Sequence, residues 1–135
     1  MTRRQTLIYF KRIAKLYGVR VHFVNNNKGG LFNKNLNLIT VGKATSLKNF
    51  ISIFFHELAH FIATQEKKFY IYHVKRYPVD AFFRTAWRAE NYVERQGCVL
   101  TKLWLPKVKY IPYYTTVKSK KFILDYYKRE GLFLK

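Results

Sequence analysis

The chain has 135 residues and carries 26 Lys and Arg against 7 Asp and Glu, a formal net charge of +19. Its hydrophobic fraction of 49% and aromatic fraction of 19% exclude a disordered basic tail, and the length allows one domain with a buried core. The single cysteine, Cys98, excludes an internal disulfide framework. We therefore expect a folded, very basic intracellular protein beside a polyanion, which could be nucleic acid, an anionic membrane face or an acidic protein.

The N-terminal part of the chain predicts one helix followed by short strands. Apolar side chains recur at helical spacing through Leu7, Phe10 and Ile13, and Gly18 is a typical helix stop. The alternating, β-branched stretch after it predicts a strand. The expected elements are a helix at 3–17, strands at 19–24, 31–32 and 36–41, and turns at 25–30 and 33–35. The pattern predicts an α+β fold with a small antiparallel sheet.

Further along, the pattern predicts mainly helices. A helix at 46–65, capped by Thr45 or Ser46, is apolar around most of its circumference and is therefore expected to be central and buried. The residues at 69–79 fit either a strand or a packed loop. The remaining predicted elements are a third helix at 81–104 with Asp80 as its cap, and a last helix at 119–130.

No segment predicts secretion or a membrane span. Lys11, Arg12 and Lys15 interrupt any apolar stretch near the N-terminus, and the longest apolar run is too short to cross a bilayer. We expect a single domain over 1–135, with its core at about 20–105 and basic helical extensions at both ends. A cytoplasmic location follows, and association with the nucleoid or packaging in a virion would suit the charge.

The chemistry-bearing motif is His56-Glu57-Leu-Ala-His60, an HExxH arrangement on the central helix. Spacing i, i+4 places both imidazoles on one helix face, where they can bind one zinc ion. Glu57 points to the flank, where it can take a proton from a zinc-bound water and act as general base. The HExxH pattern also occurs by chance, and the alternative is that these residues form a solvated polar stripe on an otherwise buried helix. Two His and a Glu on so apolar a helix favour the metal, which gives the imidazoles a partner.

A third ligand is needed, and the few acids of the chain narrow the choice. Glu90 and Glu94 lie one turn apart on the third helix, where like charges are unfavourable unless a positive group is near. We assign Glu90 as the ligand, because it lies within the apolar line of that helix. Glu94 would then accept a hydrogen bond from a ligand imidazole. The alternatives are that the two exchange roles, or that both are exposed and pair with neighbouring arginines.

Other candidate ligands fit less well. Glu66 follows His60 by six residues, but nothing in the sequence breaks the helix there as such a ligand would require. His73 could be a ligand, a donor to the transition state or a surface residue. His22 alternates within a strand and fits a structural role, and Cys98 fits an inert core position.

The motif together with the glutamate helix resembles the gluzincins, zinc peptidases with HExxH on one helix and a Glu on the next. Within that group, the glycine, hairpin strand and HELAH helix at 30–60 are similar to the ImmA/IrrE-type metallopeptidases and to the N-terminal part of ArdC-type antirestriction proteins. The helix from Glu90 to Leu100 is similar to their ligand helix, in which the first Glu binds zinc. The resemblance covers about 20–105. It implies a minimal zincin-like domain with one Zn²⁺ held by His56, His60 and Glu90.

Two functions therefore compete. The first is a zinc metallopeptidase that hydrolyses a protein, for example a DNA-associated or regulatory protein of a mobile element or phage. The second is a basic nucleic-acid-binding accessory or antirestriction-type protein with a structural or vestigial metal site. Lys and Arg at 3–20 and 107–128 would neutralise phosphates, and interleaved tyrosines such as Tyr110 would stack on bases. The alternative is that these aromatic side chains belong to the core and that the lysines solvate it.

Overall fold

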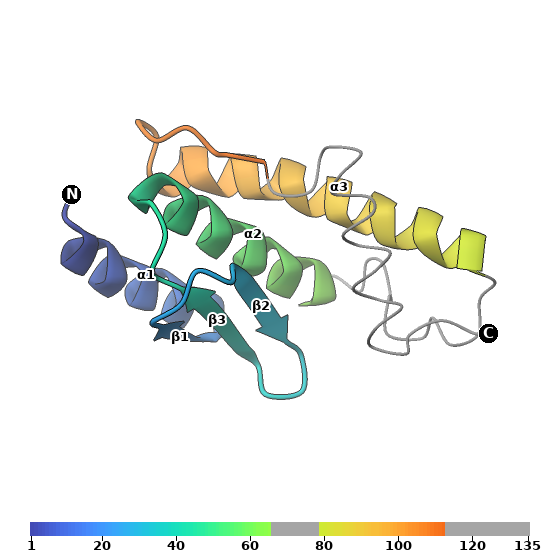
Figure 1. Ribbon diagram of the computed structural model, residues 1–135, viewed down its shortest axis with the longest axis horizontal. Helices are drawn as coiled ribbons and strands as arrows, with labels where there is room; N and C mark the ends of the chain where they lie inside the picture. Colours follow the sequence, from blue (N-terminus) through green and yellow to red (C-terminus); the bar gives the residue numbers. More distant parts are fainter. Residues whose placement is uncertain (66–78, 113–135) are drawn as a thin grey trace.

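The computed structural model of the protein describes residues 1–65 and 79–112, and within 79–90 it describes the course of a helix but not the side chains. The elements are α1 (Arg3–Tyr17), β1 (Arg20–Val24), β2 (Gly30–Asn33), β3 (Leu38–Gly42), α2 (Leu47–Gln65) and α3 (Val79–Trp104). Together they form an α+β fold (Figure 1). The helix predicted at 119–130 lies outside the described residues, as does the segment predicted at 69–79 apart from Val79.

The ends of the first two helices follow from local chemistry. At the start of α1, Gln5 N–H donates to the hydroxyl of Thr2, while the Gln5 side chain accepts from Thr2 N–H, which completes a capping box. The helix ends at Gly18, whose φ of 85° is the left-handed conformation that favours glycine. At the start of α2, Asn49 N–H donates to the hydroxyl of Ser46. These helices begin and end within a residue or two of their predicted positions.

The predicted start of the third helix is wrong by two residues. α3 begins at Val79, so Asp80 lies inside its first turn instead of capping it from outside. A carboxylate in the first turn still favours the helix through its interaction with the helix dipole, so both placements satisfy the same sequence signal.

The sheet is mixed, and the prediction of an antiparallel sheet is wrong for one of its two strand pairs. The strand order is β1-β3-β2, with β2 antiparallel and β1 parallel to the central strand β3. Ile39 and Val41 of β3 are fully buried, so the most apolar strand occupies the centre. β1 and β2 run in opposite directions. Because β3 folds back antiparallel to β2 and lies between these two strands, it runs parallel to β1. Alternating hydrophobicity predicts strands but not their partners.

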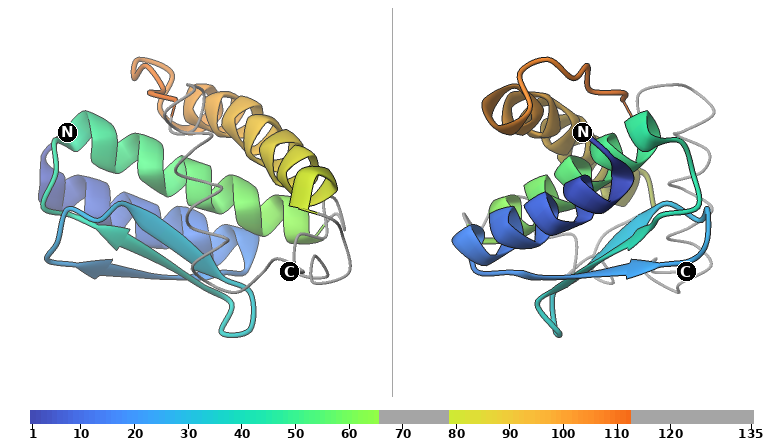
Figure 2. Two further views of the ribbon diagram at one scale, coloured as in Figure 1. Left: turned by 45° about the vertical axis from the view of Figure 1, so that its right-hand side comes forward. Right: turned by 90° about the vertical axis from the view of Figure 1, so that its left-hand side faces the viewer.

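The helices form two layers above the sheet. Helices α1 and α2 cover one face of the sheet, and α3 packs on the other side of α2 (Figure 2). Helices α2 and α3 run in opposite directions along each other (Figure 1). This arrangement encloses α2 on most sides, as its apolar circumference predicts. Among the described residues, no helix is both long enough and apolar enough to cross a membrane.

Helix α1 belongs to the hydrophobic core, although the sequence places the core at about 20–105. Phe10 is fully buried and stacks on Phe54 of α2, with ring centroids 4.0 Å apart and ring planes inclined by 7°. Phe55 meets the edge of the same ring. Offset and edge-on aromatic pairs add about 1 kcal/mol each beyond the burial of their area. The N-terminal helix therefore helps to fix the position of α2.

Candidate metal centre

The HExxH motif lies in the middle of α2, among fully buried residues of the same helix such as Phe54 and Phe55. His56 is 0% exposed and Glu57 is 4% exposed, whereas His60 is half-buried. A polar side chain at this depth is unfavourable without polar partners. The motif is therefore part of the interior of the molecule, and its contacts decide what it can do.

The two histidines point the same nitrogen at each other. Nε2 of His56 lies 3.2 Å from Nε2 of His60, and the two rings are nearly perpendicular, inclined by 76°. This convergence follows from the i, i+4 spacing, which stacks side chains on one helix face. Two nitrogens that bind one zinc ion at 2.0–2.1 Å in tetrahedral geometry are about 3.3 Å apart. The observed separation fits that requirement.

A carboxylate from α3 fixes the orientation of His56. Oε1 of Glu94 lies 2.6 Å from His56 Nδ1, and it also accepts the hydroxyl hydrogen of Tyr110 at 2.9 Å. An ionised carboxylate only accepts, which places a hydrogen on His56 Nδ1, and in the neutral form of that ring Nε2 keeps its lone pair. The contact predicted between Glu94 and an imidazole of the motif is present in the structure. The metal that this contact would serve stays a prediction.

Tyr110 joins this cluster from the segment after α3. The prediction that it stacks on bases is wrong and the alternative of a core residue holds, because Tyr110 is only 7% exposed and its hydroxyl lies against Glu94 and His56. The chain after α3 returns over α2, where Ile111 N–H donates to the hydroxyl of Ser52 at 2.9 Å. This contact brings residue 110 into the interior.

Gly97 gives Tyr110 the space that it occupies. A Cβ atom at Gly97 would lie 2.8 Å from the Tyr110 hydroxyl oxygen and 2.9 Å from Cζ of its ring. Glycine is unfavourable inside a helix by about 1 kcal/mol relative to alanine, so its presence in α3 calls for a packing reason. An isolated glycine in a helical pattern is the one sequence signal that points to this close approach.

Glu57 lies against the edge strand of the sheet. A Cβ atom at Gly30 of β2 would come within 2.8 Å of Glu57 Cγ and 2.6 Å of Ile53 Cγ2. The absence of a side chain at Gly30 therefore lets β2 approach the motif closely, which is a typical use of glycine in a strand. The glycine that precedes the hairpin strand in the sequence therefore faces Glu57 and Ile53.

Glu90, the predicted third ligand, has a described backbone but lies outside the residues whose side chains the structure describes. It precedes Glu94 by one turn of α3, about 6 Å along the helix axis. Because α2 and α3 are antiparallel (Figure 1), this step leads towards the C-terminal end of α2, which is the direction from His56 to His60. Glu94 engages the opposite side of the His56 ring from Nε2, which leaves the direct ligand position to another group.

The other candidate ligands do not join the cluster in the part of the chain that the structure describes. His22 is exposed on β1, and Cys98 is a free, partly buried thiol on α3. Glu66 and His73 lie outside the described residues. Among the side chains that are described, no group of three or more His, Cys, Asp or Glu is placed to hold a metal ion. The described part of the centre consists of two converging nitrogens, an adjacent carboxylate and the Glu94–Tyr110 support.

Compared with protein families, curated proteins and solved structures, the chain matches none of them. The chemistry of the centre therefore has to be argued from its own atoms. Two imidazole nitrogens are good ligands for zinc, and a buried carboxylate one residue from the first imidazole can move a proton. In zinc sites, a carboxylate commonly accepts a hydrogen bond from the imidazole nitrogen that does not bind the metal, and this bond orients the ring.

Proposed function

We propose that the protein is a zinc-dependent metallopeptidase of the gluzincin type, acting on a protein substrate. The observation that carries the proposal is the 3.2 Å approach of the two Nε2 atoms, combined with the bond from Glu94 to Nδ1 of His56. A simple hydrogen bond between the two imidazoles would explain the distance alone. It would not explain why an acid in a chain with so few acids is buried to orient one of the rings.

His56, His60 and Glu90 would hold the metal, one ion per chain. When bound, zinc supplies Lewis acidity, which polarises a carbonyl group and makes a water molecule acidic enough to lose a proton near neutral pH. Glu94 keeps the His56 ring in the tautomer that presents Nε2, and Tyr110 holds Glu94 in place by donating to the same oxygen. Glu90 is assigned from its position on α3 and from the resemblance to the gluzincins.

Glu57 would act as the general base and then return the proton to the leaving amine. Its burial beside Gly30 puts it under β2, which is an outer strand of the sheet within the described residues. The edge of an outer strand can bind an extended peptide through main-chain hydrogen bonds. A substrate aligned on β2 would pass the carboxylate of Glu57, and this arrangement supports a peptide as the substrate class.

The decisive experiment combines metal analysis with a cleavage assay. The protein, purified in the presence of zinc, should bind one ion and cleave a mixture of labelled peptides. Glu57→Gln should keep the ion and lose cleavage by about 10²–10⁴-fold, the usual contribution of a general base. His56→Ala and His60→Ala should lose the ion, whereas the control His22→Ala, an exposed histidine on β1, should keep it. Undiminished cleavage by Glu57→Gln would refute the mechanism.

The charge of the protein supports a second role beside the first. The first 56 residues contain no Asp or Glu, and exposed Lys and Arg occur on α1 and in the loops of the sheet. We propose that this surface lies against nucleic acid or another polyanion, and that the peptidase substrate is found there. DNA binding that weakens steeply with salt, in a protein that binds no zinc and cleaves nothing, would favour the alternative of a nucleic-acid-binding accessory protein.

A further inference from the structure

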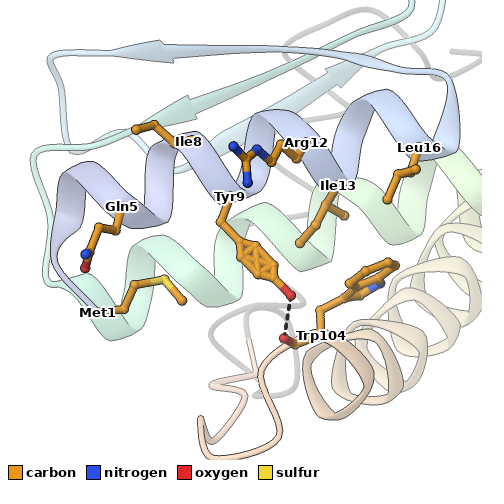
Figure 3. Close-up of a pocket in the computed structure, with 8 residues that line it drawn as sticks. All are labelled: Met1, Gln5, Ile8, Tyr9, Arg12, Ile13, Leu16 and Trp104. Atoms are coloured by element: carbon orange, nitrogen blue, oxygen red, sulfur yellow. Dashed lines mark hydrogen bonds between the residues drawn. The ribbon is translucent and has the colours of Figure 1, made fainter.

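A groove of about 690 Å³ lies outside the metal centre, between α1 and the C-terminal end of α3 (Figure 3). Its walls are mostly apolar and come from Met1, Ile8, Tyr9, Leu16 and Trp104, with Arg12 at its border. None of these residues takes part in the contacts of His56, Glu57 or Glu94 described above. The groove is therefore a separate feature that the proposed peptidase chemistry does not explain.

The walls of the groove are held together by two hydrogen bonds. The hydroxyl of Tyr9 donates to the backbone carbonyl of Trp104 at 2.9 Å, as Figure 3 shows. Nε1 of Trp104 donates to the hydroxyl of Tyr17 at 3.1 Å. These bonds span about ninety residues of sequence and connect α1 to the end of α3. The groove is thus formed before a partner arrives, which lowers the entropy lost on binding.

The shape of the groove suits a helix. Met1, Ile8 and Leu16 line the groove and are 63%, 48% and 73% exposed. Ile8 and Leu16 lie about two turns apart on α1, about 12 Å along the helix axis, and Met1 precedes the helix. Exposed aliphatic side chains beside a concave surface are typical of a site where an amphipathic helix lays its apolar face.

The charge of α1 selects the chemistry of that helix. Arg12 lines the groove, and Arg4, Lys11 and Lys15 are exposed elsewhere on the same helix, which carries no acid. Carboxylates that flank the apolar stripe of a partner helix would lie within the field of these bases. We propose that the groove binds an amphipathic helix of a partner protein, with an aliphatic stripe flanked by Asp and Glu.

Charge and shape together argue against the other occupants. A second copy of this chain would bring two +19 molecules together, and residues 113–135 of the chain itself contain six Lys or Arg and only two acids. A nucleic acid would match the charge but has no aliphatic ridge to fill the groove. A membrane would match both the charge and the aliphatic side chains, but a bilayer surface is flat, whereas the groove is concave.

The probe for the test is a synthetic, fluorescein-labelled peptide of about five turns, with Leu at i, i+3, i+4 and i+7 and Glu at the flanking positions. Its binding to the full chain is measured by fluorescence anisotropy at about 0.15 M salt, where weak surface attraction is largely screened. The double variant Ile8→Ser/Leu16→Ser should weaken binding about tenfold or more, since each leucine-sized contact contributes about one factor of ten. Leu36→Ser, which alters an exposed leucine between β2 and β3, should have no effect.

Two matched double variants test how much charge contributes to peptide binding. Arg12→Gln/Lys15→Gln should weaken binding, and Lys28→Gln/Lys34→Gln, at exposed lysines in the loops of the sheet, should weaken it much less. The same peptide with Lys in place of Glu should not bind. Binding should persist in Glu57→Gln and after chelation of metals, so the result is independent of the proposed peptidase activity.

Three outcomes would overturn the proposal. The first is no binding of the acidic peptide by the full chain. The second is binding that both charge variants weaken equally and that the Ile8 and Leu16 substitutions leave unchanged, which would show attraction to net charge alone. The third is binding to vesicles of equal parts phosphatidylcholine and phosphatidylserine that depends on Ile8 and Leu16 while peptide binding does not. That pattern would assign the groove to a membrane surface.

Discussion

The interface between α2 and α3 and the groove along α1 use charge in opposite ways. Glu94 lies at this interface, and Glu57 lies on the neighbouring face of α2, against β2. They are the two acids whose side chains the structure describes, and Glu57 is only 4% and Glu94 only 5% exposed. The α1 surface carries bases without a single acid in its sequence, and most of them are exposed. Burying a carboxylate is costly unless it is hydrogen-bonded, whereas an exposed lysine or arginine costs almost nothing.

This difference indicates what each region is built to do. A buried carboxylate is informative about chemistry, because its position has to be fixed by specific partners such as His56 and Tyr110 for Glu94. An exposed basic surface is informative about neighbours, because its field acts over about 10 Å and does not depend on the exact position of any one side chain. Substitutions should therefore change stability and metal affinity in the first region, and association alone in the second.

Among substitutions at the metal centre, the largest effect is expected for Glu94→Ala. It removes the carboxylate that accepts from both His56 Nδ1–H and the Tyr110 hydroxyl, two groups that are buried. The free energy of unfolding should fall by about 3 kcal/mol, measured by chemical denaturation. Zinc affinity should fall about 10–100-fold, as expected when the partner of a ligand imidazole is lost.

The neighbouring Arg95→Ala is the control for Glu94→Ala. Arg95 is exposed on the same turn of α3, so its loss should change stability by no more than about 0.5 kcal/mol and leave zinc affinity unaltered. Glu94→Gln keeps an acceptor oxygen and should fall between the two. Equal stabilities for the Glu94 and Arg95 variants would mean that the interface does not depend on this network.

Gly97→Ala is expected to have an intermediate effect. The new Cβ would press on the Tyr110 hydroxyl and ring, which costs about 1–3 kcal/mol, and the better helix propensity of alanine returns about 1 kcal/mol of this. The net loss of stability should be about 1 kcal/mol. In a Tyr110→Ala background the clash is absent, so the same substitution should become stabilising. A double-mutant cycle measures this reversal, and an unchanged sign would disprove the packing argument.

Much of the fold can be predicted from local patterns, and the part that cannot depends on pairing between distant segments. The helical spacing, the cap at Gly18 and the continuous apolar surface of the second helix are all properties of neighbouring residues, and these elements lie where they are predicted. The parallel pairing of β1 with β3 is not a local property. It depends on which strand occupies the buried centre of the sheet. A strand in which apolar and polar residues alternate has the same pattern in both chain directions, so the pattern does not indicate whether two strands pair in parallel or antiparallel.

The same distinction applies to the metal centre. His56, Glu57 and His60 share one helix, so their convergence follows from spacing alone. The contact with Glu94 crosses 38 positions and was expected only because the chain has few acids to choose from. Tyr110 lies 54 positions from His56 in a segment without periodicity, and nothing local marks it. Gly97 is a glycine inside a helix, and it is the one sequence signal that indicates the close approach of Tyr110.

The smallest effect on stability is expected in the second region, for Leu16→Ser. Leu16 is 73% exposed at the end of α1, so its replacement should change the free energy of unfolding by no more than about 0.5 kcal/mol. Phe10→Ala, on the buried face of the same helix, should cost about 3–5 kcal/mol. Thermal unfolding of the two variants measures this contrast. A large loss of stability for Leu16→Ser would show that the leucine stabilises the fold, and the groove would then be a structural surface. If the Leu16→Ser protein is folded and fully stable, any loss of peptide binding in this variant can be assigned to the missing side chain.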